Sequence, residues 1–156
     1  MRLNSSFWIK SCIVLLLTGV LGSDALAYRM VGTEADFIER AGFAGDAKVV
    51  ALGMDVHADS IRSTFSIQEE KLVYFMVFRN GKYLRNIKFT AEWYKPDGGR
   101  YHAQEFGQAW GNWNIAMVEL PIAGTEVVKH VGKWRLKVFE ENGELMADRA
   151  FMISSS

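Results

Sequence analysis

The 156-residue chain contains one cysteine and two prolines, and its 18 lysines and arginines balance 18 aspartates and glutamates. A lone cysteine excludes a disulfide framework and any zinc or iron–sulfur site held by several thiolates. The lack of a basic surplus argues against a nucleic-acid-binding protein, because phosphate backbones are bound by clustered positive charge. Hydrophobic residues make up 49% of the chain, which excludes a disordered protein. The length suits one domain, with or without a processed leader.

Sequence motifs for catalysis are also missing. The chain has no G-x-S-x-G, H-E-x-x-H, phosphate-binding glycine loop or G-x-G-x-x-G pattern. Outside the leader described next, the three histidines, His57, His102 and His130, are far apart in the chain and no cysteine remains as a nucleophile. We therefore expect a protein that is not an enzyme and that needs no cofactor.

The N-terminus has the pattern of a secretory signal peptide. Arg2 and Lys10 supply positive charge, Cys12–Leu21 is apolar, and Ala25–Ala27 has the small-x-small form of a cleavage site. The apolar run of about 10 residues is shorter than the roughly 20 that span a bilayer. We expect residues 1–27 to be removed, with no transmembrane span after cleavage and localisation in the periplasm or outside the cell. Cys12 would leave with the leader, so the exported domain would hold together without disulfides.

Residues 28–46 are predicted to form an N-terminal lead-in with a short helix over 34–41. Thr33–Asp36 (TEAD) resembles a capping box, and Phe37, Ile38 and Ala41 follow at helical spacing before Gly42.

Residues 47–156 have the two-residue period of β-strands. Leu72–Phe78 is a continuous apolar run, typical of a strand buried on both faces. Ile87–Tyr94 and Lys133–Val138 alternate apolar and polar residues, typical of half-buried strands. About seven or eight such segments, separated by turn signals such as Asn142-Gly143, predict an all-β sandwich. We expect Leu145–Phe151 to be an edge strand, guarded by the charges of Asp148 and Arg149.

Two segments carry a family resemblance. Glu92–Gly98 (EWYKPDG) resembles the W-x-x-P-D-G strand and turn of bacterial exported immunoglobulin-like domains, and Gly132–Phe139 (GKWRLKVF) resembles their closing G-x-W-x-V hairpin. The resemblance implies an immunoglobulin-like antiparallel β-sandwich, with Trp93 as the core tryptophan of its third strand. It implies no particular activity, since such domains serve many tasks.

One spacing is compatible with a metal. Asp55, His57 and Asp59 would share one face of an extended segment, and carboxylates with an imidazole ligate zinc or copper. Side chains two residues apart on a strand stand about 6.5–7 Å apart, which is wide for ligands of one ion. The pattern fits the solvent face of an amphipathic strand better.

Aromatic residues offer a binding candidate. Trp110 and Trp113 flank Gly111-Asn112, and with Tyr101 they have the side chains that stack on sugars or anchor proteins. The alternative is that one or both tryptophans pack into the core, as tryptophan usually does.

A basic line is the second candidate surface. Lys133, Arg135 and Lys137 alternate with core residues, and if their strand pairs with residues 88–94 the sheet presents a mixed, mostly basic stripe. The stripe is either an ordinary solvated face or a docking face for an acidic partner or anionic polymer. The sequence thus predicts an exported protein-interaction module, an accessory component of a bacterial envelope or extracellular assembly. Alternatives are a polysaccharide-binding module using Trp110 and Trp113 with Tyr101 and Asn112, and a metal-binding periplasmic protein.

Overall fold

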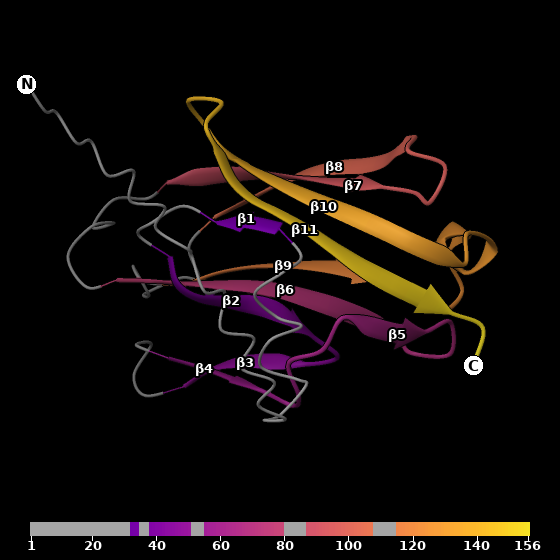
Figure 1. The fold of residues 1–156 in the computed structure, drawn as a ribbon. Helices are drawn as coiled ribbons and strands as arrows, with labels where there is room; N and C mark the ends of the chain where they lie inside the picture. The colour runs from indigo at the N-terminus through magenta and orange to yellow at the C-terminus, as the bar shows by residue number, and fades with distance from the viewer. Residues whose placement is uncertain (1–31, 35–37, 51–54, 80–86, 108–114) are drawn as a thin grey trace, which may run out of the picture. The chain divides into compact units, whose positions relative to one another are not determined.

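The computed structural model describes residues 32–34, 38–50, 55–79, 87–107 and 115–156. These residues form eleven strands, β1 to β11, and one short 3₁₀ helix, η2 (Glu126–Lys129) (Figure 1). The predicted all-β class is therefore confirmed. The predicted leader, residues 1–27, lies outside the described residues.

The first sheet contains the C-terminal hairpin. Its strand order is β1 (Gly32–Glu34), β11 (Leu145–Ser154), β10 (Gly132–Glu140), β7 (Lys88–Tyr94) and β8 (Arg100–Gly107), with all neighbours antiparallel. β5 (Thr64–Ser66) pairs in parallel with the end of β11.

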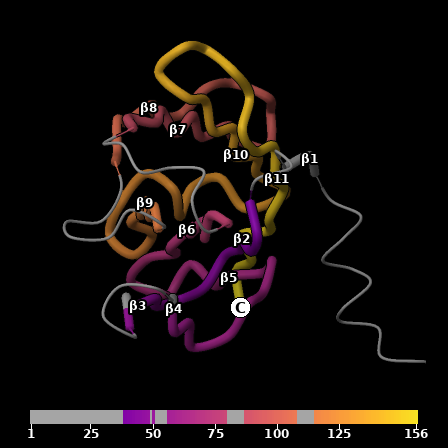
Figure 2. Tube along the Cα trace, turned by 90° about the vertical axis from the view of Figure 1, so that its left-hand side faces the viewer, coloured from indigo at the N-terminus to yellow at the C-terminus, as the bar shows by residue number. Residues whose placement is uncertain are grey.

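The second sheet contains β2 (Ile38–Ala44), β6 (Lys71–Phe78) and β9 (Ile115–Pro121), with β6 in the middle. A separate hairpin, β3 (Ala47–Val50) and β4 (Asp55–Ala58), lies on the far side of this sheet from the first one, so that three layers follow one another (Figure 1, Figure 2).

The main core lies between the two large sheets. Trp93 of β7 and Trp134 of β10 are both fully buried, and each packs against Phe151 of β11, with ring centroids 5.9 and 6.1 Å apart. From the opposite sheet, Phe43 packs on Phe151 at 4.9 Å. The burial of Trp93 in the core is as the sequence predicted.

β6 is buried on both faces, which explains its continuous apolar sequence. Leu72, Tyr74 and Met76 point into the main core, while Phe75 and Val77 belong to a second cluster. That cluster also contains Val56 of β4, and Ala47 and Ala58 pack against it, so the β3–β4 hairpin covers the outer face of the second sheet.

The predicted helix over residues 34–41 is wrong where the structure describes it. β1 ends at Glu34, and Ile38–Ala41 belong to β2. A register shift lies between Ile38 and Arg40 in the pairing with β6. A bulge adds one residue to a strand, and here Ile38 and Ala41 are both buried although they are three residues apart. The helix-like spacing therefore comes from a bulged strand.

The expected edge position of β11 is also wrong. β10 pairs along one side of β11, while β1 pairs with residues 147–149 and β5 with residues 152–154 on the other. Two short strands thus cover the segment that the sequence presented as an edge.

The predicted turns at Asp97-Gly98 and Asn142-Gly143 are confirmed. Gly98 and Gly143 have φ angles of 84° and 86°, and each donates its backbone N–H to the carbonyl three residues earlier. These turns set the pairing of β7 with β8 and of β10 with β11.

Candidate functional site

The candidate site is the outer face of the first sheet. On β10, the apolar Trp134, Leu136 and Val138 are fully buried, so Lys133 and Arg135 point to solvent and Lys137 is half-buried on the same face. β10 pairs with β7 as expected, which brings the basic line beside Glu92 and Tyr94. We name this surface the outer sheet face and define it by Glu92 and Tyr94 of β7, Arg100 of β8, Lys133, Arg135 and Lys137 of β10, and Asp148 of β11.

Strand register arranges these side chains in rows. Lys137 stands opposite Glu92 on one side and Asp148 on the other, whereas Arg135 stands opposite Tyr94 and Ala150. Directly opposite residues of antiparallel strands share a face with their Cβ atoms about 4.5–5.5 Å apart. Charges of opposite sign therefore alternate across neighbouring strands.

Arg135 and Asp148 form a two-point ion pair across β10 and β11. Nε of Arg135 donates to Oδ1 and Nη2 donates to Oδ2, both at 2.5 Å. The carboxylate is only 14% exposed, while the arginine is 57% exposed and covers it. This hydrogen bonding raises the pKa of Arg135. The pair fixes one cation and one anion in place.

Glu92 is the second anchored carboxylate. It accepts a 2.5 Å hydrogen bond from the Tyr94 hydroxyl and a 2.9 Å bond from Nη1 of Arg100. The bond from Tyr94, with help from Arg100, lowers the pKa of Glu92 against the opposing effect of burial. The same bond raises the pKa of the Tyr94 hydroxyl.

The two lysines are held less firmly. Nζ of Lys137 lies 5.5 Å from the centroid of the Tyr94 ring, a cation–π arrangement, and forms no ion pair with a described residue. Lys133 has neither an ion pair nor a side-chain hydrogen bond within the part of the chain that is described. The outer sheet face therefore has neutralised carboxylates and two available ammonium groups.

The candidate residues for stacking on sugars or anchoring a protein fall in two groups. Trp110, Asn112 and Trp113 lie outside the described residues. Tyr101 of β8 is half-buried, and its ring packs edge-on against Trp134 with centroids 5.4 Å apart. Tyr101 thus contributes to the border of the core, and its ring is partly occupied by that contact.

Of the three residues of the metal candidate, Asp59 binds backbone N–H groups of the protein itself. Asp55–Ala58 form β4, and His57 is exposed while Val56 is buried on the opposite face, as the alternation predicted. Asp59 follows the strand, and its carboxylate accepts hydrogen bonds from the backbone N–H groups of Gly45 and Ser60 at 3.1 and 2.7 Å. Burial opposes these bonds, but they and Arg62 lower the pKa of Asp59 on balance. Across the described ranges, no group of three or more His, Cys, Asp or Glu side chains is placed to hold a metal.

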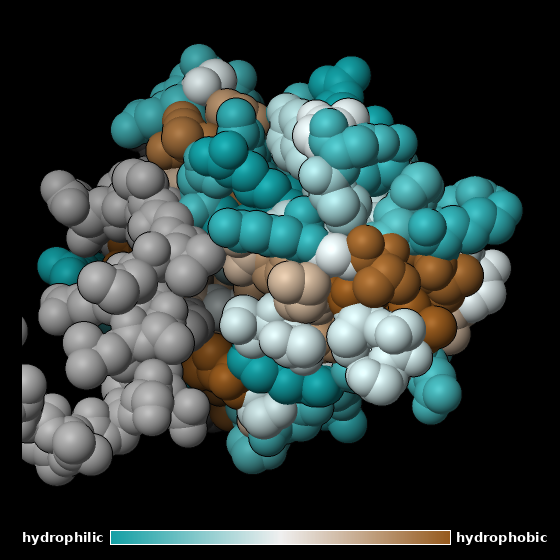
Figure 3. All heavy atoms as spheres, turned by 45° about the vertical axis from the view of Figure 1, so that its right-hand side comes forward, coloured by the Kyte–Doolittle hydropathy of each residue, from teal (hydrophilic) through white to brown (hydrophobic). Residues whose placement is uncertain are grey.

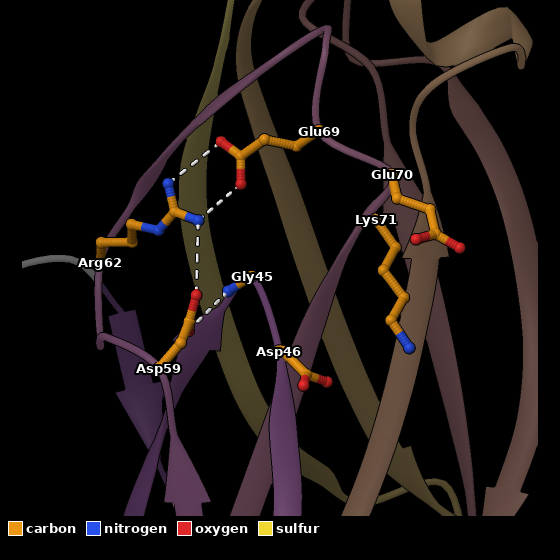
Figure 4. A pocket seen from close by; sticks show the side chains of 7 residues that line it. All are labelled: Gly45, Asp46, Asp59, Arg62, Glu69, Glu70 and Lys71. Atoms are coloured by element: carbon orange, nitrogen blue, oxygen red, sulfur yellow. Dashed lines mark hydrogen bonds and ion pairs between the residues drawn. The ribbon is translucent and has the colours of Figure 1, made fainter.

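Next to Asp59 is a polar pocket that the sequence did not indicate (Figure 4). Its volume is about 510 Å³, and its lining includes Asp46, Glu70 and Lys71. Arg62 donates from Nη1 and Nη2 to the two oxygens of Glu69 at 3.0 and 2.5 Å and lies 3.9 Å from Asp59. Lys71 is bound to Glu119 at 2.5 Å, and that bond raises the pKa of Lys71 against the effect of burial. Arg62 thus joins Glu69 and Asp59 and holds the 59–70 connection in place, while Asp46 and Lys71 pair with Lys48 and Glu119 outside the lining.

Sequence reasoning missed the Arg62–Glu69 and Arg135–Asp148 pairs for different reasons. Arg62 and Glu69 are seven residues apart in a connection with no regular period. The sequence predicts Asp148 to guard an edge, whereas the hairpin register places it opposite Lys137 and Arg135 reaches it diagonally. A hairpin register predicted from the sequence would place Asp148 on this face, but opposite Lys137 and not Arg135.

Comparison with known proteins gives no family. No family model and no curated protein matches the chain. Among solved structures, the chain is similar to Pseudomonas fluorescens alkylpurine DNA glycosylase AlkC, solved bound to DNA containing an abasic site analog, with 14% identity and a TM-score of 0.36. The match covers 72% of this chain and 30% of that one. A similarity at this level carries no argument about function.

No helix in the described ranges has the length and apolar character needed to cross a membrane.

Proposed function

We propose that the chain is an exported, non-catalytic protein-interaction module that docks through the outer sheet face. It would act as an accessory component of a bacterial envelope or extracellular assembly, in the periplasm or outside the cell. One observation carries this proposal. Hydrogen bonds and ion pairs hold the charged side chains and Tyr94 in place on one face of the sheet, while the other face packs on the core.

The outer sheet face has the composition of a recognition surface. Arginine and tyrosine are enriched at interfaces, and side chains that are already held in place lose less entropy on binding. Arg135, Arg100 and Tyr94 are each fixed by a carboxylate of the same face. An ordinary solvated strand would need no such arrangement, because isolated surface ion pairs add little stability.

We further propose that the fold is an immunoglobulin-like sandwich. Three features support this assignment: the sheet order β11–β10–β7–β8 facing β2–β6–β9, the fully buried Trp93 on β7, and the antiparallel packing of both sheets on one core. Variable-type immunoglobulin domains extend the corresponding sheet with two additional strands, and immunoglobulin domains bury a tryptophan on the strand that corresponds to β7. This fold presents interaction surfaces on its sheets as well as its loops.

The docking proposal is tested by affinity capture from envelope extract with the full chain as bait. A double variant of the face, Tyr94→Ala/Lys137→Glu, is compared with wild type, with the Lys48→Glu control on β3, and with Trp110→Ala/Trp113→Ala. We expect a protein retained by wild type and by the control to be lost with the face variant. Equal retention by all baits, or loss only with the tryptophan variant, would remove the outer sheet face as the docking site.

Export is tested separately. Expression of the full chain in a Gram-negative host, followed by fractionation and intact mass measurement, should give a periplasmic or secreted product that begins at Tyr28. A cytoplasmic product that retains Met1 would contradict it.

A further inference from the structure

The outer sheet face has an imbalance that its ion pairs do not remove. Both of its carboxylates are already neutralised, Asp148 by Arg135 and Glu92 by Arg100 and the Tyr94 hydroxyl. Lys133 and Lys137 retain positive charge without a carboxylate within ion-pair distance in the described structure. Among its defining residues the face therefore offers cations to a partner. On the same side of the sheet, Glu105 of β8, opposite Thr90, is an exposed carboxylate without an ion pair in the described structure.

The cations lie in a line along one strand. Lys133, Arg135 and Lys137 alternate on β10, and residues two apart on a strand are about 6.5–7 Å apart. An extended peptide repeats its side chains on one face at the same interval. Carboxylates at alternate positions of a partner segment would thus match the spacing of this line.

Apolar surface accompanies the charges. Met152 stands opposite Lys133 in the register of β10 and β11 and is 39% exposed, and Val131, just before β10, is 48% exposed. On the side of the molecule in Figure 3, hydrophobic areas likewise interrupt a largely hydrophilic surface. A protein segment can bury apolar and charged groups together, whereas a uniformly charged polymer makes no use of the apolar area.

We propose that the outer sheet face binds an acidic segment of a partner protein, contacted by Lys133 and Lys137. This inference rests on the proposed docking function and names the chemistry of its partner. Arg100 and Arg135 act as positioning residues that hold Glu92 and Asp148, so that these carboxylates do not pair with the lysines. A polyanion of high charge density fits less well, because it makes no use of the exposed Met152 and Val131 and because the whole chain has no basic surplus.

The test uses a fluorescein-labelled peptide with glutamates at alternate positions and leucines at one end as probe, and fluorescence anisotropy with the full chain. We expect saturable binding at 50 mM salt that weakens at 500 mM salt. Lys133→Glu/Lys137→Glu should weaken binding at least tenfold. The matched control, Lys48→Glu/Lys129→Glu, has the same net charge and should stay within twofold of wild type. Equal weakening in both double variants, or no binding to wild type, would overturn the inference.

Two further arms keep the test decisive. Lys133→Gln/Lys137→Gln removes the charges without adding repulsion toward Glu92 and Asp148, and it too should weaken binding beyond the control. Dextran sulfate and vesicles of anionic phospholipid are the competing probes. If either binds more tightly than the peptide and loses binding in the same lysine variants, the partner class is wrong.

Failure of this inference is distinguishable from failure of the docking function. A partner captured through Tyr94 that remains bound to Lys133→Glu/Lys137→Glu would leave docking intact and remove the acidic segment. If the partner is still captured by both double variants, the docking function of this face and the acidic segment are both contradicted.

Discussion

Arg135 and Asp148 meet across the C-terminal hairpin through two hydrogen bonds of 2.5 Å, although they are separated by thirteen residues in the sequence. The pairing depends on the hairpin register, which places Lys137 directly opposite Asp148 and Arg135 one row away. The guanidinium therefore reaches diagonally and leaves Lys137 without the carboxylate that it faces. Of the four cations and two carboxylates of the outer sheet face, the arginines therefore bind the carboxylates and the two lysines stay available.

A double-mutant cycle on this pair measures how much of its role is structural. We expect Arg135→Ala, Asp148→Ala and the double variant to give a coupling free energy of about 0.2–1 kcal/mol in urea unfolding, because the arginine is largely exposed. A coupling well above this range would show that the pair exists mainly for stability, and this would weaken the assignment of the face to docking.

Stability should depend on pH through Glu92 and Tyr94. The pKa of Glu92 is lowered from its ordinary 4.5, so the stability contributed by its ionised form is present above about pH 4.5 and is lost as the pH falls through the lower folded-state value. The pKa of Tyr94 is raised from 10.0, so the contribution of its protonated form is present below about pH 10 and is lost as the pH rises through the higher folded-state value.

Urea unfolding of wild type and Glu92→Gln at pH 3 and pH 7 checks the acid side. The difference in stability between the two pH values should be smaller in Glu92→Gln than in wild type. Tyr94→Phe removes the largest cause of the shift and should reduce the same difference in part. An unchanged difference in both variants would contradict the hydrogen bond between Tyr94 and Glu92.

Gly132, the first residue of β10, should be the least replaceable of the described glycines with a positive φ angle. Its φ angle is 134°, and a Cβ there would lie 3.1 Å from Cγ of Pro96 in the β7–β8 turn. Gly98 has a φ of 84° with no heavy atom within 4 Å of the added Cβ. We expect Gly98→Ala to cost about 1–2 kcal/mol from backbone strain alone. Gly132→Ala should cost at least about 1 kcal/mol more, because the new atom also collides with Pro96. Equal losses in denaturant unfolding would contradict the close approach of β10 to that turn.

Arg62 should stabilise the connection between β4 and β6. Its guanidinium is paired with Glu69 and lies over the Phe65 ring, with Cζ 4.7 Å from the ring centroid. Arg62→Ala should lower the free energy of unfolding by about 1–3 kcal/mol, since it also leaves the Glu69 carboxylate less well paired. Arg62→Lys should recover only part of this loss because it cannot make the two-point contact. Lys48→Ala, on the exposed side of β3, serves as the control and should change stability by less than about 0.5 kcal/mol.

The sequence predicts local structure best where a single physical cause, such as burial or a positive φ angle, determines the residues of a segment. β6 is buried on both faces and its residues are apolar without interruption, while β7 and β10 are buried on one face and alternate. Turns at Gly98 and Gly143 were readable because their φ angles favour glycine. The outward direction of Lys133, Arg135 and Lys137 follows from the same alternation.

Prediction failed where two causes compete. In β2, a bulge next to Ile38 places buried residues at helical spacing. The capping-box pattern before it also predicts a helix, so both signals point to the wrong structure. The sequence wrongly predicts an edge position for β11, because its partners β1 and β5 have three residues each and show no period of their own. Which carboxylate each arginine binds depends on register and on long-range contacts, and no local pattern records these.

The most direct test of the central claim is residue-resolved photo-crosslinking of the full chain in cells. A benzophenone side chain is placed at Thr90 or Met152 on the side of the first sheet that faces away from the core, and at Lys48 or Ser60 near the β3–β4 hairpin, which lies beyond the second sheet. If the outer sheet face is the docking site, the first two positions should each give one discrete crosslinked protein and the other two should give none. Crosslinks that arise from Lys48 or Ser60 alone, or equally from all four positions, would contradict it.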